Sequence, residues 1–149
     1  MNYKIFLRGI REQNSLTQQE VANILGISRT VYSKYENGYE VIPIKHLLNF
    51  CNCFNVRVDK VFGDKISENI SLNSEIDKKI IGSRLKQWRK EEKLTQDKLA
   101  KLLNTTNTVI CGYETGRRLI ATPFLYQVCH KYHVSADYLL GRIDKNSQV

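Results

Sequence analysis

The sequence predicts an all-α protein that is built from two copies of one small helical domain. Three observations indicate this fold class: apolar residues recur at helical spacing, Pro and Gly are scarce, and the chain repeats itself. SLTQQEVANIL in the first half matches KLTQDKLAKLL in the second, and Leu16 and Leu94 lie 78 residues apart. The same offset holds without a gap over nearly sixty positions, and its last pair is Gly63 and Gly141. A register kept this long indicates a tandem duplication.

The domain boundaries follow from the two copies. The stretch between them is polar and rich in Ser, Asn and charged residues, which is typical of a linker. We expect a first domain at 1–66, a linker at 67–76, a second domain at 77–142 and a tail at 143–149. Ser74 is a candidate cap for the first helix of the second copy. That copy is the more basic, because residues 80–149 carry twelve basic and six acidic side chains, against nine and six in residues 1–66.

Each copy is expected to contain five helices and no strand. The opening helix of the first copy carries Ile5, Leu7, Ile10 and Arg11. The second helix begins at Thr17, which forms a Thr-x-x-Glu capping box with Glu20. In the second copy Thr95 is followed by Lys98, so only half of the box is present. The apolar stripe of this helix is expected at Val21, Ile24 and Leu25, and its counterpart at Leu99, Leu102 and Leu103.

A turn and a third helix follow in each copy. A helix end that turns sharply favours a residue with positive φ, and Gly adopts this conformation most easily, followed by Asn. Gly26 occupies this position in the first copy and Asn104 in the second. The expected caps of the third helix are Ser28 and Thr106, its last residues Glu36 and Glu114, and the glycines that end it Gly38 and Gly116.

Two short helices close each copy. Pro43 fits the first turn of the fourth helix, and Thr122-Pro123 is a capped equivalent. The fifth helix ends before Gly63 in the first copy and before Gly141 in the second. The buried face of the fourth helix is expected at Leu47, Leu48, Cys51 and Phe54, and at Val128, Cys129 and Tyr132 in the second copy.

Composition excludes several classes of protein. The net charge of +8 and the pI near 9.4 favour a polyanionic partner. No apolar run approaches the roughly 18 residues that a membrane span needs, and the N-terminus turns charged too early for a secretory signal. We therefore expect a cytoplasmic protein with reduced cysteines. Because no nucleophile–base pair, phosphate loop or carboxylate dyad is present, we expect no enzymatic activity, cofactor or small-molecule ligand.

The cysteines and histidines do not predict a metal site. Cys51 and Cys53 have the wrong spacing for a zinc knuckle and point to opposite faces of a helix. Cys51 and Cys129 fall at the same core-facing position and are expected to be buried thiols. Cys129, His130 and His133 are the one group that could gather around an ion, and we expect no metal there.

A combination of motifs recurs in both copies. It comprises L-T-Q, a following alanine, Tyr-Glu-x-Gly and the closing D-x-L-x-G of HVSADYLLG. With these motifs, LRGIREQNSLTQQEVANILGISRTVYSKYENG and IGSRLKQWRKEEKLTQDKLAKLLNTTNTVICGYETG both resemble the Cro/repressor-type (xenobiotic-response-element) helix-turn-helix family of bacteria and phages. The resemblance covers nearly the whole chain outside the linker and the tail. It implies two tandem five-helix, lambda-repressor-like domains that recognise double-stranded DNA.

The resemblance also implies DNA-binding residues in the first copy. In that family the second helix of the motif, here called the reading helix, enters the major groove. Carried over, it begins at Arg29, and its groove-facing candidates are Arg29, Thr30, Ser33 and Lys34. Arg29 suits a bidentate contact with guanine, and Thr30 suits a base edge or a thymine methyl group. Gln18 and Asn37 match phosphate contacts of the family.

The second copy differs at these positions. The counterparts are Gln96, Asn107, Thr108, Cys111 and Gly112. Asn107 suits adenine. Gly112 lacks the cation that Lys34 supplies, whereas Arg117 and Arg118 add positive charge in the loop that follows. Two alternatives stay open for this copy: it binds DNA, or it has become a scaffold that serves dimerisation or binds no ligand.

The family also implies a structural ion pair in each copy. An Arg of the first helix pairs with the Glu of Tyr-Glu-x-Gly, which here joins Arg11 to Glu36 and Arg89 to Glu114. Removing one partner of a buried pair costs about 3–5 kcal/mol. We expect both pairs to form and to hold their helices together.

Two functions are consistent with the sequence. The first is a sequence-specific, DNA-binding transcriptional regulator of the repressor type, from a bacterium, phage or mobile element. The alternative is a protein-interaction module, antitoxin-like or an inhibitor, in which one copy serves dimerisation or partner binding. The loops YEVIPI and RRLIATP carry adjacent apolar residues, which belong either to the core or to an interface of a homodimer. Residues 64–74 span at most about 36 Å, close to the roughly 34 Å between successive major-groove faces, so adjacent heads, packed copies and a homodimer all stay open.

Overall fold

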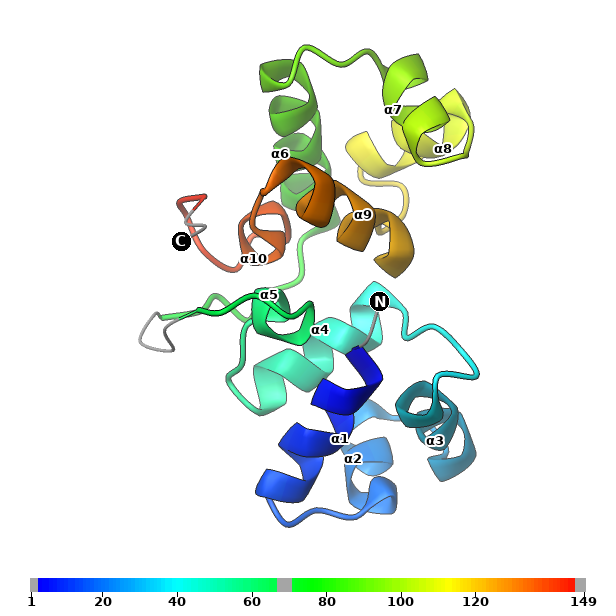
Figure 1. The fold of residues 1–149 in the computed structure, drawn as a ribbon, viewed down its shortest axis with the longest axis vertical. Helices are drawn as coiled ribbons and strands as arrows, with labels where there is room; N and C mark the ends of the chain where they lie inside the picture. Colours follow the sequence, from blue (N-terminus) through cyan, green and yellow to red (C-terminus); the bar gives the residue numbers. More distant parts are fainter. Residues whose placement is uncertain (1–2, 67–70, 147–149) are drawn as a thin grey trace. The chain divides into compact units, whose positions relative to one another are not determined.

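The fold was examined in a computed structural model that describes residues 3–66 and 71–146. These residues form two compact units, and within the described ranges all regular structure is helical (Figure 1). The first unit contains α1 (Tyr3–Gln13), α2 (Gln18–Leu25), α3 (Arg29–Asn37), α4 (Ile44–Cys53) and α5 (Val58–Val61). The second contains α6 (Lys78–Glu91), α7 (Gln96–Leu102), α8 (Asn107–Glu114), α9 (Thr122–Tyr132) and α10 (Ala136–Leu139). The predicted all-α fold of two five-helix units is confirmed.

Local capping explains where α2 and α7 begin. The Thr17 backbone N–H donates to Glu20 Oε2 at 2.7 Å, and the Glu20 N–H donates to Thr17 Oγ1 at 3.2 Å. Both bonds of the predicted capping box are therefore present. In α7 the Lys98 N–H donates to Thr95 Oγ1 at 3.1 Å, and the return bond has no carboxylate to accept it. The half box predicted for the second copy is confirmed.

The turns after α2 and α7 follow the same rule in both units. Gly26 has a φ of 68° and Asn104 a φ of 55°, which is the left-handed region that the sequence predicted there. The side chains of Ser28 and Thr106 accept from the N–H groups of Val31 and Val109, so they cap α3 and α8 as expected. The short turn and the fixed cap set where the third helix of each unit starts.

Two predicted caps are wrong. Asp77, and not Ser74, caps α6, because Asp77 directly precedes the helix and its Oδ1 accepts from Lys79 N at 2.9 Å and Ile80 N at 3.3 Å. Thr122 is the first residue inside α9 and is buried, while Ala121 holds the cap position without a side-chain hydrogen bond. Pro123 lies in the first turn of α9, where its missing N–H costs nothing.

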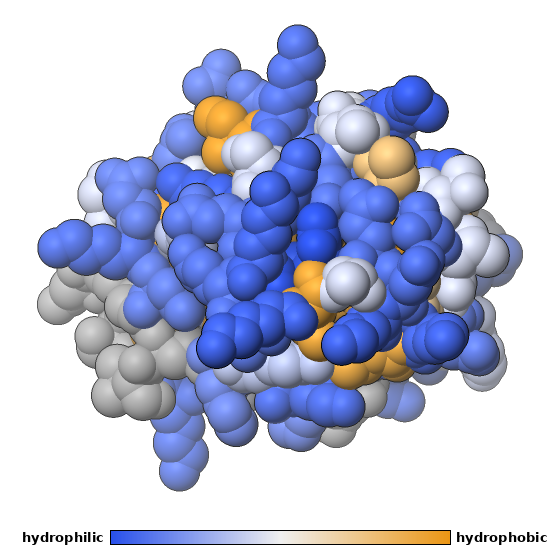
Figure 2. All heavy atoms as spheres, turned by 90° about the horizontal axis from the view of Figure 1, so that it is seen from above, coloured by the Kyte–Doolittle hydropathy of each residue, from blue (hydrophilic) through white to orange (hydrophobic). Residues whose placement is uncertain are grey.

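Each unit has its own hydrophobic core. In the first unit α3 packs against α1 and α2, and α2 also packs against α4; in the second unit α8 packs against α6 and α7. Within α2 the buried residues are Val21, Ala22 and Leu25, whereas Ile24 is 47% exposed. The prediction of Ile24 as part of the stripe was wrong, because the buried arc of this two-turn helix includes Ala22 in its place. On the face shown in Figure 2, hydrophilic residues predominate and hydrophobic ones form only small, separate patches.

The predicted interface loops are only partly exposed. Ile42 and Ile120 are buried, so both loops contribute to the cores. Tyr39 is 82% exposed and Val41 48% exposed, which leaves an apolar surface in the loop of the first unit alone. Cys51 and Cys129 are buried, as expected for core thiols.

The segments on either side of the second domain are held against it. Part of the predicted linker, residues 67–70, lies outside the described residues. Beyond it, the Asn73 N–H donates to the Arg142 carbonyl at 2.9 Å, and Asn146 Oδ1 accepts from the Ser135 N–H at 2.9 Å. Arg84 Nη1 also donates to the Ile143 carbonyl at 2.5 Å. The second unit thus includes residues on both sides of 77–142, while the domain boundaries stay a prediction.

The described residues contain no helix long and apolar enough to cross a membrane.

Candidate nucleic-acid interface

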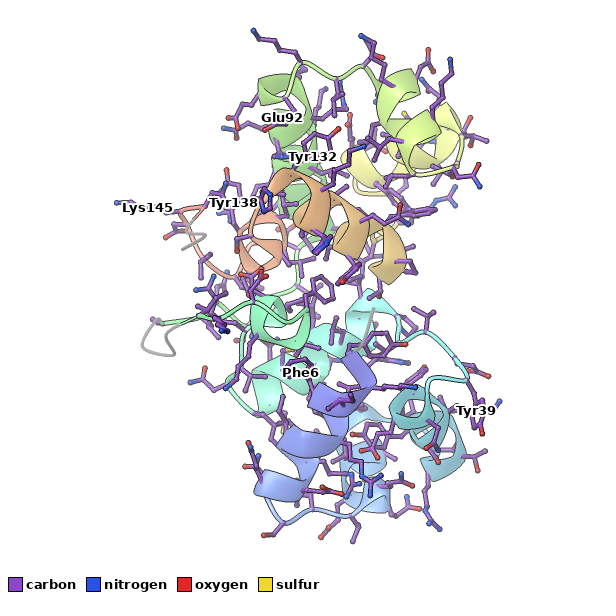
Figure 3. All side chains as sticks on the ribbon, in the orientation of Figure 1. Phe6, Tyr39, Glu92, Tyr132, Tyr138 and Lys145 are labelled. Carbon is purple, nitrogen blue, oxygen red and sulfur yellow. The ribbon has the colours of Figure 1, made fainter. Side chains whose placement is uncertain are left out.

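The predicted DNA-binding residues of the first copy gather on one surface. In the first unit α3 lies at the edge, beside α2 (Figure 1). A shallow hollow on this surface brings together side chains from α2, α3 and the following loop. Its lining residues are Gln18, Arg29, Thr30, Ser33, Lys34, Asn37 and Tyr39. All six residues predicted for this copy therefore share one face, and Tyr39 extends it from the loop (Figure 3).

A cluster of three side chains fixes α3 against α1 and α2. The Arg11 guanidinium donates to both carboxylate oxygens of Glu36, from Nε at 2.6 Å and from Nη2 at 3.1 Å. Its Nη1 donates to the Leu16 carbonyl at 2.8 Å, which ties down the turn before α2. Gln18 Nε2 donates to Glu36 Oε2 at 3.0 Å. The ion pair expected between the first helix and the Tyr-Glu-x-Gly motif is present, and it includes Gln18.

The surroundings of Glu36 favour its ionised form. Its side chain is only 2% exposed, and burial by itself raises the pKa of a carboxyl group. The hydrogen bonds from Arg11 and Gln18 outweigh burial and hold the pKa of Glu36 below its usual value. A charged carboxylate that accepts three hydrogen bonds is held more firmly than a neutral acceptor, so the cluster fixes α3 against α1 and α2.

The second copy repeats this cluster. Arg89 donates to Glu114 from Nε at 2.5 Å and from Nη2 at 3.1 Å, and its Nη1 donates to the Leu94 carbonyl at 2.7 Å. Gln96 Nε2 donates to Glu114 Oε2 at 2.8 Å. Both ion pairs are thus present. Gln18 and Gln96, expected as phosphate contacts, are oriented by a carboxylate that lies behind them.

Three side chains at the C-terminal part of the reading helix, Ser33, Lys34 and Asn37, already have partners. Lys34 Nζ lies 2.7 Å from Glu40 Oε1, and both side chains are nearly half exposed. Asn37 Nδ2 donates to Ser33 Oγ at 3.1 Å. Arg29 and Thr30 are exposed. Sequence reasoning missed Glu40, although an acidic residue six positions after a lysine at the end of a helix was a visible signal.

The reading face of the second copy is arranged differently. Asn107 Nδ2 donates to Asp97 Oδ1 at 2.7 Å, so a carboxylate of α7 holds the predicted adenine reader. Thr108, Arg117 and Arg118 are exposed. A Cβ atom on Gly112 would lie 3.1 Å from Arg118 Nε, which means that the Arg118 side chain lies across this glycine. The sequence predicted that Gly112 lacks the cation of Lys34 and that Arg118 adds one from the following loop, and the structure adds that the Arg118 side chain reaches back to α8 at Gly112.

Comparison with known proteins assigns both copies to helix-turn-helix families. A family model described as "Helix-turn-helix" matches residues 7–61, and one described as "Helix-turn-helix domain" matches residues 82–145. The chain is 36% identical over 64 residues to the "Uncharacterized HTH-type transcriptional regulator YqaE" of Bacillus subtilis (strain 168). It is 39% identical over 62 residues to the "HTH-type transcriptional regulator ImmR" of the same organism. It is 41% identical over 61 residues to "Antitoxin PezA" of Streptococcus pneumoniae serotype 4 (strain ATCC BAA-334 / TIGR4).

These relatives match only part of the chain and of themselves. The matches cover 43%, 42% and 40% of this chain, which is about one copy. They cover 55%, 49% and 39% of the respective relatives. The similarity therefore applies to single domains.

Proposed function

We propose that this chain, which carries two tandem helix-turn-helix domains of the Cro/repressor type, is a sequence-specific DNA-binding transcriptional regulator of the repressor type. One observation carries the proposal: the residues predicted for DNA contact in the first copy lie together on the exposed face of α2 and α3. The printed names of two relatives, both transcriptional regulators, support it. Its site of action would be the cytoplasm of a bacterium, on chromosomal, phage or mobile-element DNA.

The proposed contacts divide into two kinds. Base reading is assigned to the outward-facing positions of each reading helix, to Arg29, Thr30, Ser33 and Lys34 and to Asn107 and Thr108. Lys34, in the last turn of α3, is also assigned a contact with phosphate. Phosphate contact is assigned to Gln18, Asn37, Gln96, Arg117 and Arg118. The basic net charge of +8 would attract the duplex and supply most of the affinity. The exposed Val41 is the proposed contact for a homodimer, since Tyr39 in the same loop lines the proposed DNA-binding face.

The test is the salt dependence of binding. The full chain is titrated onto a random-sequence duplex, and fluorescence anisotropy gives the affinity over a series of salt concentrations. We expect a steep fall of affinity with salt, and Arg29→Ala plus Lys34→Ala should make the slope of log K against log salt shallower by about one to two. The matched control, Arg8→Ala plus Lys60→Ala, removes two cations from α1 and α5. A shallow slope that neither double variant changes would contradict DNA binding.

A second candidate function rests on one relative, whose printed name is "Antitoxin PezA". In this alternative one copy binds a protein partner while the other binds DNA. The Asp97 carboxylate at the Asn107 side chain favours it for the second copy, because an anion on this face opposes phosphate. Selection of sites from a random DNA pool by chains carrying Asn107→Ala plus Thr108→Ala separates the two functions. An unchanged selected site would favour the protein-binding alternative for this copy.

A further inference from the structure

The same two positions touch each other in both copies, with different chemistry. In the first copy Lys34 near the end of α3 contacts Glu40 in the following loop. The offset of 78 residues maps this pair onto Gly112 and Arg118, which are also in contact. The Arg118 N–H donates to the Gly112 carbonyl at 3.3 Å, as the Glu40 N–H donates to the Lys34 carbonyl at 3.4 Å. The backbone geometry is therefore shared, and only the side chains have been exchanged.

In the first copy this pair cancels its own charge. The Lys34 ammonium and the Glu40 carboxylate are 2.7 Å apart, with 44% and 47% of their side chains exposed. An exposed ion pair of this kind is weak, so a phosphate group can displace the carboxylate. As long as the Lys34–Glu40 ion pair is intact, the Lys34 ammonium group is not available to bind a phosphate of DNA. Glu40 is thus an intramolecular competitor of phosphate.

In the second copy the pair leaves a net positive charge. Gly112 lies inside α8, where glycine is less favourable than almost any other residue. The three atoms nearest to a Cβ built on it, at 3.1 to 3.7 Å, all belong to the Arg118 side chain. Arg118 is exposed and forms no ion pair with any described residue of the chain. The absence of a side chain at position 112 gives the guanidinium a path across the helix.

We propose that these two positions set the electrostatic attraction of each head for DNA, an inference that rests on the proposed function. In the first copy Glu40 restrains Lys34 and weakens binding to non-matching DNA, so that base contacts decide where this head binds. In the second copy Arg118, admitted by Gly112, is the phosphate-binding cation of the reading helix. It offsets Asp97, the carboxylate that lies beside Asn107 on the same head.

The experiment measures affinity and salt slope for the full chain on a random-sequence duplex. Glu40→Gln should raise the affinity roughly threefold and steepen the slope by about one, because it releases Lys34. Arg118→Gln should lower the affinity roughly threefold and make the slope shallower by about one. Two controls change the same charge elsewhere: Glu12→Gln breaks a more exposed pair, with Arg8 on α1, and Lys86→Gln removes an exposed cation from α6.

Gly112→Gln tests the coupling of the two positions without changing the net charge. Its side chain fills the path of Arg118 and improves helix propensity, so the melting temperature should not fall. The affinity should fall toward that of Arg118→Gln, and the double variant should be no weaker than Arg118→Gln alone. Wild-type affinity in Gly112→Gln would overturn the coupling.

The outcomes separate this inference from the proposed function. If the wild-type chain shows no salt-dependent binding to duplex DNA, the proposed function fails, and the inference fails with it. If the wild type binds but Glu40→Gln and Arg118→Gln behave like Glu12→Gln and Lys86→Gln, only the inference fails. Opposite changes of the slope in Glu40→Gln and Arg118→Gln, larger than in the controls, support both.

Discussion

One buried carboxylate organises the geometry of each reading helix. Glu114 accepts two hydrogen bonds from Arg89 and one from Gln96, and its side chain is 2% exposed. Arg89 at the same time holds the carbonyl of Leu94 in the turn before α7. α6, α7 and α8 therefore meet at this one carboxylate, and the position of Gln96 on the proposed DNA-binding surface depends on it. Glu36 accepts the equivalent bonds from Arg11 and Gln18, so the two copies share this feature.

Glu114→Gln should destabilise the second unit by about 3–5 kcal/mol, because it keeps the shape but strands the buried Arg89 charge. Trp88 is the single tryptophan of the chain and is buried in this unit, so its fluorescence during urea unfolding follows the second unit alone. Adding Arg89→Met should recover part of the loss by removing the stranded charge. Glu92→Gln, at an exposed position, serves as the control. A loss no larger than in this control would show that the ion pair is not structural.

At the scale of elements, the two copies differ in how firmly their second helix starts. In α2 the Thr17 N–H donates to the Glu20 carboxylate, and this bond holds the pKa of Glu20 below its usual value. In α7 Lys98 takes the place of the glutamate, and its positive charge lies at the positive end of the helix dipole. The start of α7 is therefore the less stable of the two.

Lys98→Glu should complete the capping box of α7 and stabilise the second unit by about 0.5–1 kcal/mol. The measurement is again urea unfolding followed by Trp88 fluorescence. Lys101→Glu makes the same charge change at the other end of α7, where a carboxylate opposes the dipole, and it should destabilise slightly. Equal effects of the two substitutions would mean that net charge, and not the capping geometry, decides the result.

Sequence reasoning predicted those features of each element that depend on neighbouring residues. Thr17 with Glu20, Gly26 and Ser28 each act within four positions along the chain, so their patterns are visible in the sequence. The prediction of Ser74 as the cap was wrong because both Ser74 and Asp77 are residues that can cap a helix. Which of them caps α6 depends on where the helix begins, and it begins at Lys78, directly after Asp77.

The missed contacts of the candidate site have a common cause. The hydrogen bond of Gln18 to Glu36 and the path of Arg118 over Gly112 require a long side chain to cross between elements. Neither the spacing of residues nor helix propensity predicts the direction in which such a long side chain points. The resemblance predicted the Arg11–Glu36 pair and the positions expected to face DNA. It gave no information on which acidic side chains pair with the residues of the reading face, such as Glu40 with Lys34.

Across the whole molecule, the duplication has kept one buried aspartate and moved its partner. Asp59 and Asp137 are fully buried at equivalent positions. Arg57 Nη2 binds Asp59 at 2.7 Å from two residues before it, whereas Arg142 Nη1 binds Asp137 at 2.5 Å from five residues after it. The counterpart of Arg57 is Ser135, whose hydroxyl caps α10 by accepting from the Tyr138 N–H. A serine at that cap cannot neutralise the aspartate, so the arginine comes from the other side.

This exchange predicts that the arrangement of one copy can be transplanted into the other. Arg57→Ser should destabilise the first unit by about 3–5 kcal/mol, because Asp59 is left buried without that arginine. The Asp64 N–H donates to the Asp59 carbonyl at 3.0 Å, as the Arg142 N–H does to Asp137 at 2.8 Å. An arginine at position 64 therefore starts from the same backbone position as Arg142, and adding Asp64→Arg should restore at least half of the loss.

Far-UV circular dichroism during urea unfolding follows both units, while Trp88 fluorescence should not change, because it reports on the second unit. Asp64→Lys in the Arg57→Ser background is the matched control: it makes the same charge change but lacks the planar fork that binds a carboxylate with two hydrogen bonds. Equal recovery by Lys and Arg would reduce the effect to net charge. Recovery by Arg alone would show that an arginine before the buried aspartate and an arginine after it can form the same ion pair. After a duplication each copy changes separately, so the two copies can keep the buried aspartate and differ in the position of the arginine.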